Sequence, residues 1–357
     1  MTTAPRVLIL SADIGAGHDL PAELLADGIR ERAAHAVIAD GLTEMGRLAH
    51  VLGRQGVETI LRRLPVIFDA QYWVIQRFPP TRKLAAWALE RIARRGLQRL
   101  IARERPDVIV STYPGTTEVL GRMRLAGRVA VPCVGAITDL AALRYWAHAG
   151  MDRHLIIHAQ SRAEVEAIAG AQTEIRHVRG LSRPQFDQPP EREQARAALG
   201  LPPGALVLIS GGGWGVGDLH RAARAAIAAG ATPVCLCGTN AALRARLDRQ
   251  GIRTEGFTEH MCEWLAAADV LVHSTAGLTV LEAELCGTWA ISYGWGFGHI
   301  RINNEAYRRF GLAAVAETPQ ALEAELCRAL AAPRPRPSDV ASWPSAADAV
   351  LELVSPR

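Results

Sequence analysis

Two glycine-rich loops in this sequence have the composition of anion-binding turns. The first, from Ser11 to His18, and the second, from Ser210 to Asp218, each follow a short apolar run and precede an alanine-rich stretch. Glycine lets the backbone turn sharply and approach an anion, and a helix that begins there presents free N–H groups. We therefore predict phosphate-binding chemistry at both loops. The alternative, that the glycines only tighten a turn between strand and helix, stays open for either loop alone.

Familiar nucleotide-binding signatures do not fit these loops. Leu20 stands where a dinucleotide-binding fingerprint has its third glycine, and the second loop lacks the Lys-Ser or Lys-Thr ending of a P-loop. The sequence therefore disfavours a nicotinamide-dependent dehydrogenase and a P-loop ATPase.

One histidine, His18, directly follows the first loop. Imidazole titrates near neutral pH, so a histidine in this place is suited to remove a proton from an acceptor hydroxyl. An ordinary loop histidine is the alternative.

A third candidate turn, from Ser274 to Ala283, follows the apolar run Val270 to His273. Ser, Thr and Gly at a helix N-terminus can hold a diphosphate, and the Glu282 carboxylate one turn further along can accept two hydrogen bonds from a ribose diol. Thr279 and Glu282 also have the spacing of a capping box, in which Glu282 would only satisfy the helix's own N–H groups.

The elements that must position these residues have an α/β pattern. Apolar runs of four to six residues alternate with helical stretches over 357 residues, which predicts parallel sheets covered by helices on both faces. Two doubly wound, Rossmann-like domains that face a cleft would bring ligands to the carboxyl ends of their strands. The predicted segments are an acceptor-binding domain over 1–183, a linker over 184–199, a nucleotide-sugar-binding domain over 200–335 and a tail with a helix over 336–357.

Composition excludes several classes of protein. With 49% hydrophobic and 21% charged residues, the chain is globular and neither disordered nor fibrous. We find no apolar run of about 20 residues and no signal-peptide pattern, so we expect a protein that neither spans a membrane nor is secreted. The six cysteines lack the spacing of a zinc site or a disulfide framework and are expected to be reduced core thiols.

Positive charge is concentrated between Leu61 and Arg105, a segment that contains eleven basic residues and three acidic ones. Aromatic residues are interleaved with the arginines, which favours contact with an anionic lipid surface. The alternative is a solvated helix with Trp87, Leu89 and Ile92 packed inward. No nucleic-acid motif accompanies the charge, so nucleic acid is not an expected partner. The residues expected at the acceptor or membrane are Trp73, Arg77, Arg82, Lys83, Trp87 and Trp146.

In their order and spacing these stretches resemble the GT-B glycosyltransferases of the monogalactosyldiacylglycerol synthase and processive diacylglycerol glucosyltransferase group. The peptidoglycan N-acetylglucosaminyltransferase is a more distant likeness. The resemblance runs from Val7 to about Ala313. It is carried by Ser11–His18, Pro106–Pro114, Thr138–Leu140 with Trp146 and Asp152, Gly180 with Pro184 and Phe186, the Gly211 loop, Cys237–Asn240, Gly256–Phe257, Ala268–Asp269 and Ser274–Ala283.

This resemblance implies a GT-B fold and inverting transfer of a hexose from a nucleotide-diphosphate sugar, with UDP as the expected nucleotide, no bound metal and no further cofactor. It also implies His18 as the general base, with Asp139 as a candidate helper. Preorganised N–H dipoles in place of a cation would stabilise the departing diphosphate. The implied donor contacts are Gly17, Gly213, Gly215, Phe257, Ser274, Thr275, Gly277, Leu278, Thr279 and Glu282.

The chain departs from the group where the sugar would be held. Members that resemble the diacylglycerol enzymes have Gly-Gln-Glu where this chain has Gly298, His299 and Ile300. Either the hexose contact has passed to His299, Arg301 or Asn303, or the donor differs from UDP-glucose and UDP-galactose.

The expected activity is transfer to a lipid hydroxyl, such as that of diacylglycerol, by a cytoplasmic protein peripheral to the inner face of the cell membrane. Two alternatives stay open. One is a tailoring glycosyltransferase that acts on a small soluble metabolite. The other is a GT-B protein that binds a nucleotide and transfers nothing.

Overall fold

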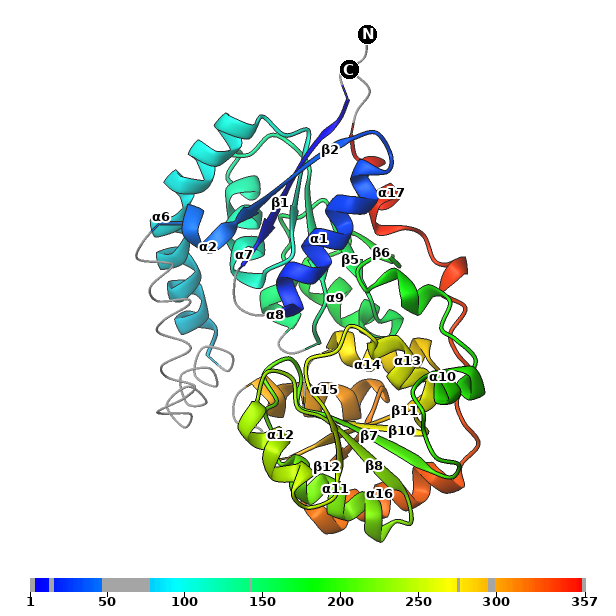
Figure 1. Ribbon diagram of the computed structural model, residues 1–357. Coiled ribbons are helices and arrows are strands. Elements are labelled where there is room, and N and C mark those ends of the chain that lie inside the picture. Colours follow the sequence, from blue (N-terminus) through cyan, green and yellow to red (C-terminus); the bar gives the residue numbers. More distant parts are fainter. Residues whose placement is uncertain are drawn as a thin grey trace. The chain divides into compact units, whose positions relative to one another are not determined.

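The computed structural model describes residues 4–12, 16–46, 78–140, 143–274, 277–294 and 299–354. It divides into two compact units, the first made of Met1–Arg183 with Ala341–Arg357 and the second of Pro184–Val340. Each unit contains a parallel sheet flanked by helices (Figure 1), so the predicted α/β class is confirmed. The chain passes from the first unit to the second after Arg183 and returns to the first after Val340.

The predicted linker is part of the second unit. Its helix α10 (Arg192–Ala198) is held to the sheet because Arg196 forms an ion pair of 2.9 Å with Asp269, whose carboxylate also accepts from the Leu206 amide at 2.8 Å. The C-terminal tail rejoins the first unit because the buried Arg153 donates to the Ala349 carbonyl and pairs with Glu352 at 3.1 Å. Both segments are held by arginines whose partners lie far away in the sequence.

In the first unit, six parallel strands lie in the order β2-β1-β3-β4-β5-β6. The strands are β1 (Arg6–Ser11), β2 (His35–Asp40), β3 (Val108–Ser111), β4 (Cys133–Ile137), β5 (Arg153–Ile156) and β6 (Glu174–His177). The helices are α1 (Ala16–Arg30), α2 (Gly41–Glu44), α6 (Pro79–Glu104), α7 (Pro114–Leu125), α8 (Leu143–Trp146), α9 (Arg162–Ala169) and α17 (Ala346–Leu351). Alternate residues of β1 and β3 face α6 and α7 on one side and α1 and α17 on the other (Figure 1).

Helix α6 buries only a narrow stripe against this sheet. The stripe consists of Ala93, Leu97 and Leu100. By contrast, 48% of Trp87 and 40% of Ile92 is exposed, so the alternative that they pack inward is wrong for these two side chains. It is right for Leu89, which is partly buried against this core. The spacing of the apolar residues fits a helix, but the small Ala93 and the two leucines already fill the space over the sheet.

In the second unit, the order of the parallel strands is β12-β11-β10-β7-β8-β9. They are β7 (Leu206–Ser210), β8 (Thr232–Leu236), β9 (Arg253–Glu255), β10 (Val270–His273), β11 (Trp289–Tyr293) and β12 (Ala314–Ala316). The remaining helices are α11 (Leu219–Ala228), α12 (Ala241–Asp248), α13 (Met261–Ala267), α14 (Gly277–Leu285), α15 (His299–Phe310) and α16 (Pro319–Ala331). Helices α11 and α16 cover one face of the sheet, and α10, α13 and α14 cover the other (Figure 1).

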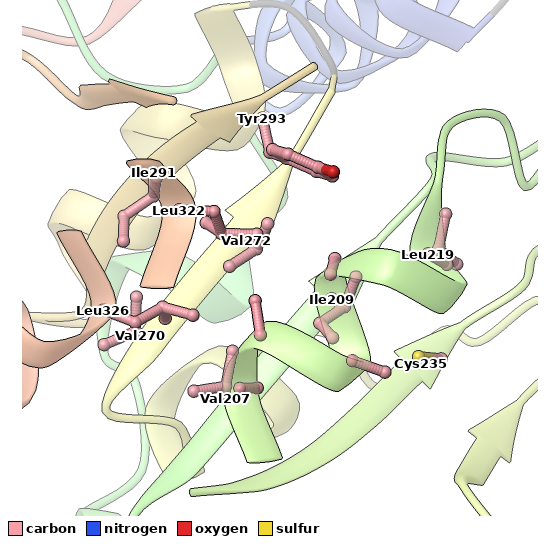
Figure 2. Close-up of a cluster of buried hydrophobic side chains, with 14 of the residues drawn as sticks. Val207, Ile209, Leu219, Cys235, Val270, Val272, Ile291, Tyr293, Leu322 and Leu326 are labelled. Carbon is pink, nitrogen blue, oxygen red and sulfur yellow. The ribbon is translucent and has the colours of Figure 1, made fainter. Parts of the chain in front are cut away.

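The core under α11 and α16 is made of branched side chains from the two central strands. Figure 2 shows Val207 and Ile209 of β7 beside Val270 and Val272 of β10, with Leu326 of α16 packed on them. Helix α11 offers mainly alanines to this core, and their small side chains let the helix lie close to the sheet. The close packing holds β7 and β10 side by side, and the loops that follow them carry the candidate site.

Two histidines of the first unit, the buried His154 and the partly buried His148, are expected to make its stability dependent on pH. His154 accepts a hydrogen bond of 3.1 Å from the His148 backbone N–H, and burial lowers the pKa of both imidazoles to about 4. In the unfolded chain their pKa is about 6.5, so between these values only the unfolded state binds the protons. The free energy of unfolding therefore falls as the pH drops through this window.

We expect a lower thermal midpoint at pH 5 than at pH 7.5, measured by circular dichroism. A His154→Asn variant should show a shallower decline, because one of the two groups is removed. Substitution of the exposed His35 by asparagine is the matched control and should keep the slope of the unmodified protein. Equal slopes in all three proteins would contradict the assignment.

Candidate active site

The candidate donor site lies at the point where the strand order of the second sheet reverses. From the centre of the sheet, β7, β8 and β9 follow one another toward one edge, and β10, β11 and β12 follow one another toward the other edge. Strands β7 and β10 are therefore neighbours in the centre. In open parallel sheets, ligands bind at the carboxyl ends of the strands that flank such a point. Here these ends lead into the Gly211 loop and the Ser274 turn, and the Ser274 hydroxyl donates to the Val216 carbonyl at 3.1 Å. The structure thus brings two of the predicted turns together.

The Gly211 loop is held in place by hydrogen bonds from the turn that follows β8. Thr239 donates to the Gly213 carbonyl through its backbone N–H at 2.9 Å and its hydroxyl at 3.1 Å, and the side-chain Nδ2 of Asn240 donates to the Gly215 carbonyl at 3.2 Å. Gly215 has a φ of +61°, and a Cβ there would lie 2.1 Å from the Cys237 carbonyl oxygen. Glycine is therefore required at this position for both conformation and space.

Four amides in this loop, those of Gly213, Trp214, Gly217 and Asp218, donate to no acceptor in the described part of the chain, and the first two lie at the tip of the turn. The Gly215 N–H already donates to the Gly212 carbonyl at 3.1 Å within the turn, and the next helix is capped by Asp218, which accepts from the Arg221 amide at 3.1 Å. Among the residues that the structure describes, the Gly213 and Trp214 N–H groups have no acceptor. These two amides are thus available to an anion, and the Trp214 amide was not among the sequence predictions.

Phe257 lies over the loop from the segment that follows β9. A Cβ placed on Gly213 would lie 3.9 Å from Phe257 Cε2, and 64% of Phe257 is exposed. An exposed aromatic ring beside free amides is a suitable platform for a planar base. Trp214 is equally exposed in the same loop.

Helix α14 begins at Gly277, so Thr279 lies in its first turn and is not its N-cap. The capping-box alternative, which needs Thr279 as the cap, is therefore wrong. Glu282 is nearly buried on this helix, Gly277 is buried, and Leu278 and Thr279 are partly exposed. Thr275 lies outside the described residues.

Helix α15 carries the residues predicted to contact the sugar, and these residues differ in their exposure to solvent. Asn303 is fully buried, so it offers no surface to a ligand. Its neighbour Asn304 accepts a hydrogen bond of 2.5 Å from the buried Ser292 hydroxyl of β11, which fixes the helix to the sheet. Arg301 is exposed in the first turn of the helix. The side chain of His299 lies outside the described residues.

In the first unit, the strand order reverses between β1 and β3. The loop after β1 leads into α1, and the Ser11 hydroxyl donates to the Asp19 carboxylate at 2.5 Å, which holds the first turn of the helix against the end of the strand. The side chain of His18 and the surroundings of Gly17 are outside the described part of the structure. Asp139, after β4, is buried and accepts from the Leu140 amide at 2.8 Å.

The residues expected at the acceptor or membrane divide into three groups. Trp87 and Lys83 of α6 are exposed and Arg82 is partly exposed. Trp146 is buried in the first unit, so the prediction that it contacts an acceptor or a membrane is wrong for this structure. Trp73 and Arg77 lie outside the described residues.

Three further predictions concern the chain as a whole: the state of its cysteines, metal ligands and membrane-spanning helices. All six cysteines are free thiols; five are buried and Cys327 is exposed, which differs from the core position expected for it. In the described ranges, no three His, Cys, Asp or Glu residues gather as metal ligands. No described helix combines the length and the apolar character that crossing a membrane requires.

For the nucleotide-sugar donor that the family resemblance implies, a Phe257→Ala variant is expected to raise the KM about tenfold while kcat changes little, because loss of a stacked ring costs about 1–1.5 kcal/mol of binding. Steady-state kinetics would measure both constants. The matched control is Trp289→Ala, since Trp289 is an exposed aromatic at the amino end of β11, away from the ligand edge of the sheet. An equal rise in KM for both variants would contradict the role of Phe257.

In comparisons with known proteins, the chain is similar to enzymes that glycosylate diacylglycerol. The family model for monogalactosyldiacylglycerol (MGDG) synthase matches residues 18–181. A processive diacylglycerol beta-glucosyltransferase of Bacillus pumilus is 23% identical over 328 residues, which cover 88% of this chain and 84% of that protein. Relatives with the same description from Bacillus cereus are 20% identical.

Solved structures show the same fold. MurG of Acinetobacter baumannii aligns with a TM-score of 0.57 and 14% identity over 99% of both chains. UGT89C1 of Arabidopsis thaliana, solved with UDP, aligns with a TM-score of 0.53 and 13% identity over 92% of this chain and 91% of its own. With its two doubly wound units and these relatives, the chain is a GT-B glycosyltransferase that resembles the monogalactosyldiacylglycerol synthase and processive diacylglycerol glucosyltransferase group.

Proposed function

We propose that this protein transfers a hexose from a UDP-sugar to a lipid hydroxyl such as that of diacylglycerol, at the membrane surface, with inversion at the anomeric carbon and without a metal ion. The relatives named for diacylglycerol support the acceptor class, and the fold shared with a protein solved with UDP supports the nucleotide. The second unit binds the donor, and the first unit binds the acceptor.

The observation that carries this proposal is the junction of two turns at the centre of the second sheet. The Ser274 hydroxyl joins them through the Val216 carbonyl, and the free amides of Gly213 and Trp214 lie in one of them. Amides fixed in this way can stabilise the charge that develops on a departing diphosphate, and each donor is worth about 3 kcal/mol in the transition state. Glu282 is assigned to the ribose and Phe257 to the base.

In the proposed reaction the acceptor oxygen forms a bond to the anomeric carbon on the face opposite the diphosphate. The bond between that carbon and the diphosphate oxygen breaks, and the leaving group keeps the electron pair. His18 takes the hydroxyl proton, with Asp139 as its helper. For the sugar, Arg301 is the candidate contact because it is exposed in the first turn of α15, whereas Asn303 is buried.

A donor and acceptor screen tests this proposal. The purified chain is incubated with UDP-glucose, UDP-galactose and UDP-N-acetylglucosamine, each with vesicles that contain diacylglycerol or with a panel of soluble alcohols and phenols, and products are read by mass spectrometry. A hexosyl diacylglycerol with the inverted anomer supports the proposal. Transfer to soluble acceptors alone would replace it with the tailoring function, and retention of the anomeric configuration would contradict the mechanism.

A further inference from the structure

One side chain at the donor site, the indole of Trp214, has no role in the proposed reaction. Trp214 stands in the Gly211 loop between Gly213 and Gly215, and 64% of the residue is exposed. Burial of a tryptophan ring removes a large apolar area from water, and this exposed ring contributes little of that stabilisation to the fold. The gain is therefore left for a ligand that covers the indole.

The backbone on both sides of Trp214 is fixed without help from the indole. The Gly213 carbonyl accepts from the Thr239 N–H at 2.9 Å and from the Thr239 hydroxyl at 3.1 Å. The Gly215 carbonyl accepts from Asn240 Nδ2 at 3.2 Å. Only the two side-chain torsions χ1 and χ2 then remain to be ordered when a ligand meets the ring. An aromatic ring on a rigid turn thus binds at a small cost in conformational entropy.

The main chain of Trp214 places the indole close to the diphosphate. In the described part of the chain, neither the N–H nor the carbonyl of Trp214 has a hydrogen-bond partner, and the N–H is one of the two amides assigned to the diphosphate. The indole belongs to the same residue as that amide. A group bonded directly to the diphosphate is therefore within reach of this side chain.

Two groups are bonded directly to the diphosphate of a nucleotide sugar, the ribose and the hexose. The ribose is assigned to Glu282 of α14. The base is one ribose further from the diphosphate, and its platform is Phe257, whose Cε2 lies 3.9 Å from a Cβ placed on Gly213. The hexose is left as the group next to the diphosphate that the indole can cover.

A hexose ring suits an indole by its chemistry. The hydroxyl groups of a pyranose lie around its rim, so its faces consist of C–H groups. The face of an aromatic ring carries negative charge density, which attracts these polarised C–H groups, and the contact removes apolar area of both rings from water. Stacking of this kind leaves the rim hydroxyls free for polar groups such as the exposed Arg301.

We infer that the indole of Trp214 stacks on a C–H face of the donor's hexose, with the UDP-sugar of the proposed function as the ligand on which this inference rests. Trp214 is then a specificity-determining residue: it raises the affinity for a hexose-bearing nucleotide and leaves the affinity for the bare nucleotide unchanged. The bonds that form and break during transfer, and the proton that moves, do not involve it.

Calorimetric titration of the full chain with UDP, UDP-glucose and UDP-galactose, each without an acceptor, tests this contact. In a Trp214→Ala variant, we expect the Kd of whichever UDP-hexose the unmodified protein binds to rise about tenfold, while the Kd of UDP stays within about twofold. Trp214→Phe keeps an aromatic face and should recover most of the lost affinity. The ratio of the two Kd values is the deciding quantity, because a general disturbance of the loop would weaken UDP binding as well.

Trp289→Ala is the matched control, since Trp289 is an exposed tryptophan of the same unit at the amino end of β11. It should leave every Kd within about twofold. The thermal midpoint of Trp214→Ala should equal that of the unmodified protein, because the ring is exposed. A lower midpoint with an unchanged ratio of Kd values would show that the indole packs on protein and would overturn the inference.

Failure of the donor and failure of the stacking contact give different results. If the unmodified protein binds neither UDP-hexose, the UDP-sugar donor of the proposed function is wrong, and the role of Trp214 is wrong with it. If the unmodified protein binds a UDP-hexose but Trp214→Ala weakens UDP and the UDP-hexose equally, or weakens neither, only the role of Trp214 is wrong.

Discussion

A His18→Ala variant is expected to transfer sugar about 10²- to 10⁴-fold more slowly than the unmodified protein, because that is the usual contribution of a positioned general base. The effect should appear in kcat, since the acceptor hydroxyl must lose its proton in the transition state. The KM for the donor should change little, because all the groups assigned to the donor except Gly17 lie in the second unit. Steady-state assays with the donor and acceptor from the screen would measure both constants.

Two controls separate this role from a structural one. UDP affinity of the His18→Ala variant, measured by titration calorimetry, should equal that of the unmodified protein. A His35→Ala variant removes an exposed imidazole of the same unit, at the start of β2, and should keep full activity. Turnover of His18→Ala close to the normal rate would remove His18 as the base, and Asp139 would then be the group to replace next.

Local sequence patterns were enough to predict the α/β class and the glycine loops. A strand, a glycine turn and a helix occupy consecutive residues, so periodicity and composition show them directly. Local patterns could not predict the pairing of β7 with β10, because about 60 residues separate Ser210 from Val270. Strand order depends on how the whole core packs, and only the structure shows that the Gly211 loop and the Ser274 turn adjoin.

Burial was the property that the sequence predicted least well. Trp146 and Asn303 stand in or near motif-like stretches, yet both side chains are buried. Trp87 was correctly placed in a basic aromatic segment, but its half-exposed position beside an arginine-lined groove depends on the packing of α6 against α7. The free Trp214 amide could have been suspected from its place between Gly213 and Gly215, since amides inside glycine turns often lack acceptors.

Replacement of Gly215 by alanine is expected to lower kcat/KM about 100-fold. The residue has a φ of +61°, and the added methyl group would lie 2.1 Å from the Cys237 carbonyl oxygen, 2.8 Å from Asn240 Cβ and 2.9 Å from the Cys237 carbonyl carbon. Two of these atoms are backbone, so the loop itself must move. A shift of about 1 Å would displace the Gly213 and Trp214 amides from the diphosphate, and misplacement on that scale costs about 10²-fold in rate.

A second glycine separates this displacement from the strain of the backbone conformation alone. Gly230, at the end of α11, also has a positive φ of +79°, but a Cβ there would meet nothing within 4 Å. Gly230→Ala should therefore lose about 1–2 kcal/mol of stability through its left-handed conformation and keep its activity. Thermal midpoints report the strain in both variants, whereas kcat/KM and UDP affinity report the position of the loop. If Gly215→Ala loses no more activity than Gly230→Ala, the Gly211 loop does not hold the leaving group, and the assignment of the donor site to the junction of β7 and β10 is wrong.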